Sequence, residues 1–72
     1  MFFQHIEDCR VDHDKTQLFV AAYLNMNRSV YWRYEKGQRE IPVWAVLKLA
    51  ELYNVSTDYL LGRTDDPTPP HA

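Results

Sequence analysis

Basic and aromatic side chains are clustered together in residues 27–40, in the middle of a chain whose formal net charge is −2. The basic residues are Arg28, Arg33, Lys36 and Arg39, and the aromatic residues are Tyr31, Trp32 and Tyr34. Guanidinium and ammonium groups donate charge-assisted hydrogen bonds to phosphate. This segment therefore favours binding to a polyanion.

Charge is unevenly distributed along the chain. Residues 16–48 hold five basic and two acidic residues, a balance of +3, whereas the remainder has a balance of −5. Because a charged face acts over a Debye length of about 8–10 Å, a basic face can bind a polyanion even on an acidic protein. The alternative is a solvated surface with uneven charge, and charge alone does not decide between them.

A second set of reactive side chains, His5, Cys9 and His13, is spaced at intervals of four residues. On a helix they share one face, and imidazole and thiolate are zinc ligands. However, a fourth ligand is missing, and a buried thiol acts as a small hydrophobic group. We predict no metal site. The chain also lacks a glycine-rich phosphate loop and a nucleophile beside an obvious base, so we predict no enzyme and no cofactor.

Short helices are predicted to position residues 27–40 and the set of His5, Cys9 and His13. Residues 3–14 carry a modest apolar ladder, and Thr16 is a good N-cap for a second helix. The buried stripe of that second helix is predicted to consist of Val20, Ala21 and Leu24.

A tight connection follows the second helix. Asn25 tolerates a left-handed turn, and Asn27 can cap a third helix that runs to Lys36. Gly37 stands where a helix C-terminus favours positive φ. Two helices joined by so short a turn predict a helix-turn-helix unit.

Two further helices and a tail complete the predicted order. Pro42 marks the start of the fourth helix, whose predicted stripe is Val43, Val46, Leu47, Ala50 and Tyr53. Ser56 can cap a short fifth helix over residues 57–61, which Gly62 closes. We predict one domain over residues 1–63 and a disordered, proline-rich tail over residues 64–72.

The composition is typical of one small globular domain. The 72 residues are 46% hydrophobic and 25% charged, and only one is cysteine. No apolar run approaches the roughly 20 residues that cross a membrane, and the N-terminus lacks the pattern of a secretory signal. A single cysteine leaves no internal disulfide, which favours a reducing compartment. We expect a cytoplasmic protein.

Several motifs occur in register over residues 6–62. They are Thr16-Gln17, Ala21, Leu24, Tyr34-Glu35-x-Gly37-x-Arg39, Leu47-x-Leu49-Ala50 and Val55-Ser56-x-Asp58-Tyr59-Leu60-Leu61-Gly62. The combination resembles the Cro/CI-type helix-turn-helix domains of phage repressors and small bacterial regulators. This chain has Asn25 where that family usually has glycine, and Tyr31 where the family usually has isoleucine or valine. It has Cys9 where the family usually has leucine.

The resemblance implies an all-α, five-helix, lambda-repressor-like DNA-binding domain and assigns roles to individual residues. The base-contacting residues, on the third helix in the major groove, would be Asn27, Arg28, Ser29 and Arg33. The phosphate-contacting residues would be Thr16, Gln17, Lys36, Gln38 and Arg39. An ion pair between Arg10 and Glu35 would join the first and third helices. Either arginine on the third helix could alternatively contact phosphate only, and Arg10 and Glu35 could be unconnected surface charges.

The resemblance also implies a sequence-specific transcriptional regulator, a repressor, that binds a pseudo-palindromic operator in double-stranded DNA as a homodimer. The dimer candidates are Tyr59, Leu60 and Leu61. We expect weak dimerisation because the sequence shows no second domain.

Apolar side chains on the second helix, at Leu18, Phe19 and Tyr23, leave a different function open. We expect Phe2 and Phe3 to cover Phe19 and Tyr23. If they do not, the patch favours a protein-interaction adaptor, such as an antirepressor or antitoxin-like protein. We expect Tyr31 and Tyr34, three residues apart, to face the core beneath the third helix, and Trp32 has no assigned role.

Overall fold

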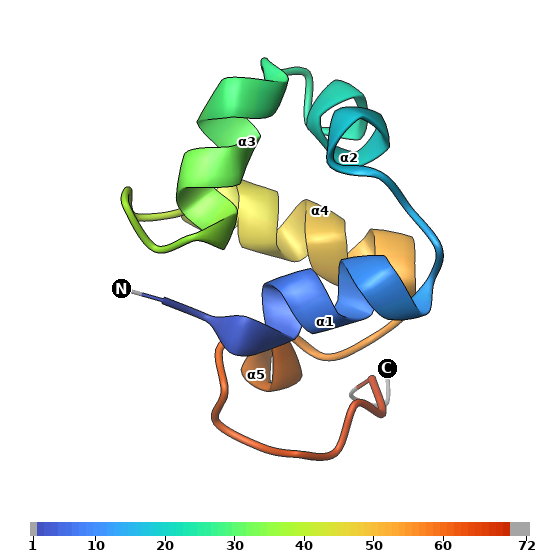
Figure 1. Ribbon diagram of the computed structural model, residues 1–72. Coiled ribbons are helices and arrows are strands. Elements are labelled where there is room, and N and C mark those ends of the chain that lie inside the picture. The colour runs from blue at the N-terminus through green and yellow to red at the C-terminus, as the bar shows by residue number, and fades with distance from the viewer. Residues whose placement is uncertain (1, 70–72) are drawn as a thin grey trace.

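The computed structural model of the protein describes residues 2–69, which form five α-helices and no strand (Figure 1). The helices are α1 (Gln4–Asp12), α2 (Gln17–Tyr23), α3 (Arg28–Glu35), α4 (Val43–Tyr53) and α5 (Thr57–Leu60). The predicted all-α, five-helix fold is confirmed. Among the described residues, no helix is both long enough and apolar enough to cross a membrane.

Side-chain caps begin α2 and α5 as the sequence predicts. The Thr16 hydroxyl oxygen accepts a hydrogen bond from the Phe19 N–H at 3.0 Å. The Ser56 hydroxyl oxygen accepts one from the Tyr59 N–H, also at 3.0 Å. Each cap satisfies one backbone donor that a helix N-terminus otherwise leaves unpaired.

Left-handed residues other than glycine follow three of the helices. Asn25 has φ of 58° and makes the turn between α2 and α3, and Asn54 has φ of 54° at the end of α4. Asp14, with φ of 56°, follows α1 and explains why this helix is shorter than the predicted 3–14. Asparagine and aspartate tolerate this conformation because their short polar side chains form local hydrogen bonds.

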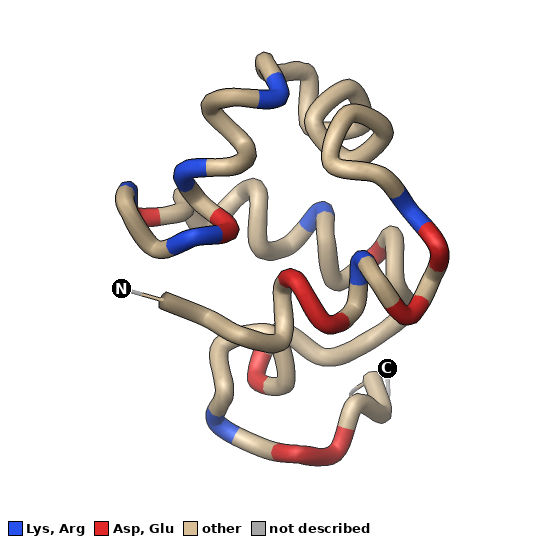
Figure 2. The backbone as a smooth tube through the Cα atoms, viewed as in Figure 1, with Lys and Arg blue, Asp and Glu red and all other residues tan. Residues whose placement is uncertain are grey.

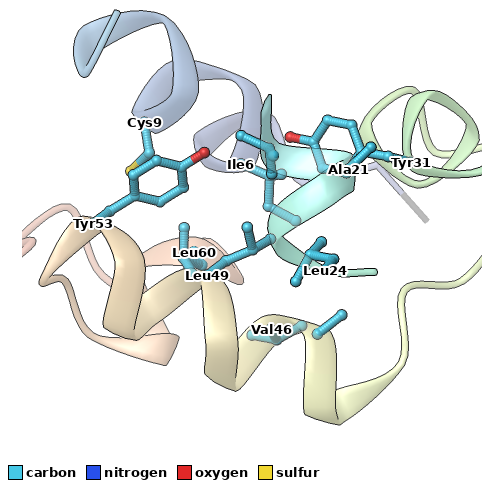
Figure 3. Close-up of a cluster of buried hydrophobic side chains, with 11 residues drawn as sticks. Ile6, Cys9, Ala21, Leu24, Tyr31, Val46, Leu49, Tyr53 and Leu60 are labelled. Atoms are coloured by element: carbon cyan, nitrogen blue, oxygen red, sulfur yellow. The ribbon is translucent and has the colours of Figure 1, made fainter. Parts of the chain in front are cut away.

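All five helices contribute to one hydrophobic core (Figure 3). The buried apolar residues are Ile6, Cys9, Val20, Ala21, Leu24, Tyr31, Ala45, Val46, Leu49, Tyr53 and Leu60. The predicted stripe of α2 is therefore confirmed. Figure 3 shows Cys9 beside the ring of Tyr53, so a small thiol and a large aromatic ring fill this end of the core together.

The buried face of α4 differs from the predicted one. Val46 and Tyr53 are buried as predicted, but Val43 is 75% exposed and Leu47 is 52% exposed. Ala45 and Leu49 are buried in their place. The sequence VWAVLKLAELY is apolar on more than one side, so helical spacing alone permits several overlapping stripes.

The N-terminal segment lies away from α2, so the predicted cover over Phe19 is wrong. A Cβ atom added to Gly37 would lie 2.9 Å from the Phe2 Cα atom, which places Phe2 against the turn after α3. Phe3 packs against the core beside α4 and α5. In Figure 1 the N-terminus and α2 lie on opposite sides of the molecule.

The described part of the predicted tail forms no helix. The Ser56 N–H donates to the Pro67 carbonyl oxygen at 3.1 Å, which places the segment beside the start of α5. Residues 70–72 of the predicted tail lie outside the described residues. Disorder of residues 64–72 stays a prediction.

Candidate DNA-binding surface

The outward face of α3 carries the predicted base-contacting residues. Asn27, Arg28 and Ser29 are exposed at its N-terminal end, and Arg33 is exposed one turn further along. The Asn27 side chain makes no capping hydrogen bond, although its backbone has the N-cap conformation. None of the ion pairs within residues 2–69 involves Arg28 or Arg33. Among the described residues, their guanidinium groups thus have no carboxylate partner within ion-pair distance.

The aromatic residues of α3 divide between core and surface. Tyr31 is fully buried, as predicted. Tyr34 is only half-buried and lies outside the core, so its predicted core position is wrong. Trp32 is also half-buried.

A buried carboxylate, Glu35, lies on the inner face of α3 and collects four hydrogen bonds. Arg10 donates from Nε to Oε2 at 2.8 Å and from Nη2 to Oε1 at 3.1 Å. The Tyr31 hydroxyl donates to Oε2 at 2.6 Å, and Gln17 Nε2 donates to Oε1 at 3.2 Å. The expected ion pair between Arg10 and Glu35 is thus present, and we call these four residues the Glu35 cluster.

Hydrogen bonding keeps the carboxyl group of Glu35 ionised within the cluster. Burial by itself raises the pKa of Glu35, but the hydrogen bonds from Arg10, Tyr31 and Gln17 outweigh it and lower this pKa below its usual 4.5. The hydrogen bond to Glu35 raises the pKa of Arg10, whereas burial is the main cause that raises the pKa of Tyr31. At neutral pH the cluster is therefore a carboxylate, a guanidinium and two neutral groups. It joins α1, α2 and α3 and fixes the orientation of α3.

Gln17 connects this cluster to the surface. Its Nε2 donates to Glu35, and its Oε1 accepts from Arg28 Nη1 at 3.3 Å. Both polar atoms of the Gln17 side-chain amide, a predicted phosphate contact, are thus already hydrogen-bonded. The neighbouring Thr16 hydroxyl accepts its capping hydrogen bond and keeps its own proton to donate.

The remaining predicted phosphate-contacting residues follow α3. Lys36 is the C-cap residue, and the Gln38 N–H donates to the Arg33 carbonyl oxygen at 2.9 Å, closing the helix end. Arg39 is exposed. Lys36 Nζ lies 2.9 Å from Glu7 Oε2 of α1, an ion pair that the sequence did not predict.

Basic and acidic residues are concentrated in different regions of the molecule, although some neighbour one another. Figure 2 shows basic residues along α3 and the loop that follows, and acidic residues along α1 and the C-terminal segment. The basic side is thus the side that carries the predicted base-contacting residues, consistent with the local charge balance of the sequence.

The apolar patch predicted on α2 is smaller than expected. Leu18 is 65% exposed and Phe19 is 47% exposed, with Lys15 Nζ 4.7 Å from the centre of the Phe19 ring. Tyr23 is half-buried, and its hydroxyl donates to the Lys48 carbonyl oxygen at 3.1 Å, which ties it to α4. The exposed patch therefore consists of Leu18 and Phe19.

A second apolar surface, on α4, was not predicted. Val43, Trp44 and Leu47 are each at least half exposed. Val43 and Leu47 also line a groove of about 340 Å³ between α4 and α5, which Phe3 and Leu61 border. The signal for this surface was present in the sequence, because α4 contains more apolar residues than one face can bury.

The three predicted dimer candidates have different environments. Leu60 is fully buried in the core, so its side chain is not part of a surface. Tyr59 stacks on His5 with ring centres 4.1 Å apart, and Leu61 borders the groove. Of the three predicted residues, Tyr59 and Leu61 therefore remain candidates for a dimer interface.

The side chains of His5, Cys9 and His13 do not converge. His5 Nδ1 lies 2.6 Å from the Tyr59 carbonyl oxygen, and His13 Nδ1 lies 2.8 Å from the Cys9 carbonyl oxygen. Burial raises the pKa of the Cys9 thiol to about 11. Within residues 2–69, no three His, Cys, Asp or Glu side chains are placed to share a metal ion.

The fold and this surface define a class, the helix-turn-helix proteins, in which α2 and α3 are the paired helices. A family model described as Helix-turn-helix matches residues 6–60. The chain therefore belongs to the helix-turn-helix family of the Cro/CI type, a family of transcriptional regulators and not of enzymes.

Curated relatives with this domain are regulators and a phage repressor. The uncharacterised HTH-type transcriptional regulator YobD of Bacillus subtilis is 38% identical over 69 residues, which cover 96% of this chain and 62% of YobD. The HTH-type transcriptional regulator ImmR of the same organism is 37% identical over 86% of this chain and 49% of ImmR. The cryptic phage CTXphi transcriptional repressor RstR of Vibrio cholerae is 38% identical over 90% of this chain and 59% of RstR.

The chain thus spans between about half and three fifths of the length of these relatives. No solved structure matches it significantly.

Proposed function

We propose that this protein is a sequence-specific DNA-binding transcriptional repressor that inserts α3 into the major groove of double-stranded DNA. The observation that carries the proposal is the two-sided construction of α3. Arg28 and Arg33 are exposed on its outer face, while Glu35 is held by hydrogen bonds beneath it. A rigidly held helix that presents planar guanidinium groups is suited to donate two hydrogen bonds to guanine O6 and N7.

Base contacts and phosphate contacts have separate roles in this proposal. Asn27 and Ser29 flank Arg28 at the end of α3 that would lie nearest the bases. The backbone contacts would come from Thr16 and Gln17 on one side, and from Lys36, Gln38 and Arg39 on the other. Phosphate contacts fix position and affinity but carry no sequence information directly.

The repressor is proposed to act as a weak homodimer on a pseudo-palindromic operator. Two-fold symmetry would place the two α3 helices about 34–36 Å apart, one turn of DNA. The exposed apolar side chains of Val43 and Leu47, with Leu61 at the groove between α4 and α5, support a dimer surface there. Tyr59 belongs to α5, and Leu61 is the C-cap residue of that helix.

The test is binding to random duplex DNA and to the DNA upstream of the gene, measured over a salt series. Log K should fall with log salt at a slope of about 0.9 for each phosphate neutralised. Arg28→Ala and Arg33→Ala should each remove about 1–3 kcal/mol of discrimination between the two DNAs. Arg63→Ala, at an exposed arginine after α5, is the matched control and should leave discrimination unchanged.

The other candidate function is a protein-interaction adaptor. It is favoured by the exposed Leu18 and Phe19, because the N-terminal segment does not cover them. Absence of DNA binding at low salt would contradict the repressor proposal and leave this surface as the candidate site.

A further inference from the structure

The proposed DNA-binding surface needs the ammonium group of Lys36, but this group forms an ion pair with Glu7. Lys36 Nζ lies 2.9 Å from Glu7 Oε2, and the pair joins the end of α3 to α1. The Lys36 side chain is 37% exposed and that of Glu7 is 25% exposed. A carboxylate thus holds this ammonium group in the free protein, at the edge of the basic surface.

The local contacts show that Lys36 is the principal partner of Glu7. Arg10 Nη2 is 3.9 Å from Glu7 Oε2, but Arg10 already donates two shorter hydrogen bonds to Glu35. Arg10 is therefore committed to the buried carboxylate. Removing the charge of Glu7 would leave the Glu35 cluster intact and would release only Lys36.

We propose that Glu7 competes with DNA phosphate for Lys36 and thereby lowers the affinity of this protein for DNA. The inference rests on the proposed function, because it requires that the surface beside Lys36 meets the phosphate backbone. Carboxylate and phosphate oxygens are both anionic acceptors for an ammonium group. Lys36 can neutralise a phosphate only to the extent that it leaves Glu7.

The competition predicts a change in both affinity and salt dependence. Glu7→Gln keeps the size of the side chain and removes its charge. It should tighten binding to random duplex DNA about two- to fivefold at low salt, the range expected for one exposed ion pair. It should also steepen the salt slope by up to about 0.9, since Lys36 then neutralises fully a phosphate that it neutralises only in part while Glu7 competes for it.

Asp8→Asn is the matched control, because it removes one negative charge from the same helix. Asp8 accepts a hydrogen bond from Gln4 Nε2 at 2.9 Å, and none of the ion pairs within residues 2–69 involves it. A general electrostatic effect of α1 would make the two variants alike. Competition for Lys36 predicts a steeper slope for Glu7→Gln only.

Lys36→Gln completes the experiment as a double-mutant cycle. In the Lys36→Gln background, Glu7→Gln should give no increase in slope and no more tightening than Asp8→Asn gives. Equal slopes for Glu7→Gln and Asp8→Asn, or an undiminished effect of Glu7→Gln without Lys36, would overturn the proposed competition while DNA binding itself stands. If the parent and every variant fail to bind DNA at low salt, the repressor proposal and this inference are both overturned.

Discussion

The inner and outer faces of α3 both carry charged side chains, but the inner one is buried and the outer ones are exposed to solvent. On the inner face, Glu35 is fully buried and accepts hydrogen bonds from Arg10 and Tyr31. On the outer face, Arg28 and Arg33 are exposed, and no ion pair within the described residues holds them. A buried charge is costly unless it is paired, whereas an exposed charge is solvated by water. Burial therefore decides that the inner charges fix the helix while the outer charges remain available to a ligand.

The largest expected effect comes from breaking the inner face. Arg10→Met removes the guanidinium and leaves the Glu35 carboxylate buried without its cation, which should cost about 3–5 kcal/mol of unfolding free energy. Arg33→Met makes the same chemical change on the outer face and should alter stability by no more than about 0.5 kcal/mol. Urea denaturation of both variants measures the difference. Equal midpoints would show that the two faces do not differ in the way proposed.

A smaller effect is expected from the two tyrosines of α3. Tyr31→Phe removes a 2.6 Å hydrogen bond to a buried carboxylate and should cost about 1.5–3 kcal/mol. Tyr34→Phe removes a hydroxyl from a half-buried side chain outside the core and should change stability by no more than about 0.5 kcal/mol. The urea midpoints should therefore separate the two variants. A comparable loss in both would place Tyr34 in the structural role assigned to Tyr31.

Local signals predicted the features that depend on neighbouring residues in the chain. The hydroxyl groups of Thr16 and Ser56 cap helices by accepting hydrogen bonds from nearby backbone N–H groups. Asn25 makes its turn because asparagine tolerates a left-handed backbone conformation. The pairing of Arg10 with Glu35 is long-range, and only the family resemblance made it predictable. Gln17 was assigned to phosphate in the same way, but the resemblance did not indicate that its amide lies between Glu35 and Arg28.

Features that depend on how the helices pack were not predictable from local pattern. The apolar residues of α4 permit several stripes, and packing selects the one with Ala45 and Leu49 inside. The contact of Phe2 with Gly37 and the ion pair of Lys36 with Glu7 both join the N-terminal region to the end of α3. Nothing in the spacing of these residues indicates that they meet, because the approach of α1 to α3 creates both contacts.

The smallest effect near neutral pH is the titration of Glu35, which becomes visible only in acid. The pKa of Glu35 in the folded protein is below its usual 4.5, so the unfolded chain binds the proton more readily. The stabilisation from this carboxylate is therefore fully present above about pH 4.5 and is lost as the pH falls through the lowered pKa of the folded state. The urea midpoint of the parent protein should be independent of this group at neutral pH and should decline in acid.

Two glutamine variants isolate the contribution of Glu35. Glu35→Gln cannot titrate at this position, so its stability, already lower at neutral pH, should decline less steeply in acid than that of the parent. Glu40→Gln removes an exposed carboxylate from the loop after α3 and should keep the decline of the parent. If Glu35→Gln and the parent declined in parallel, the acid sensitivity would belong to other carboxylates. The inner face of α3 would then be held by hydrogen-bond geometry, and the charge of Glu35 would contribute little.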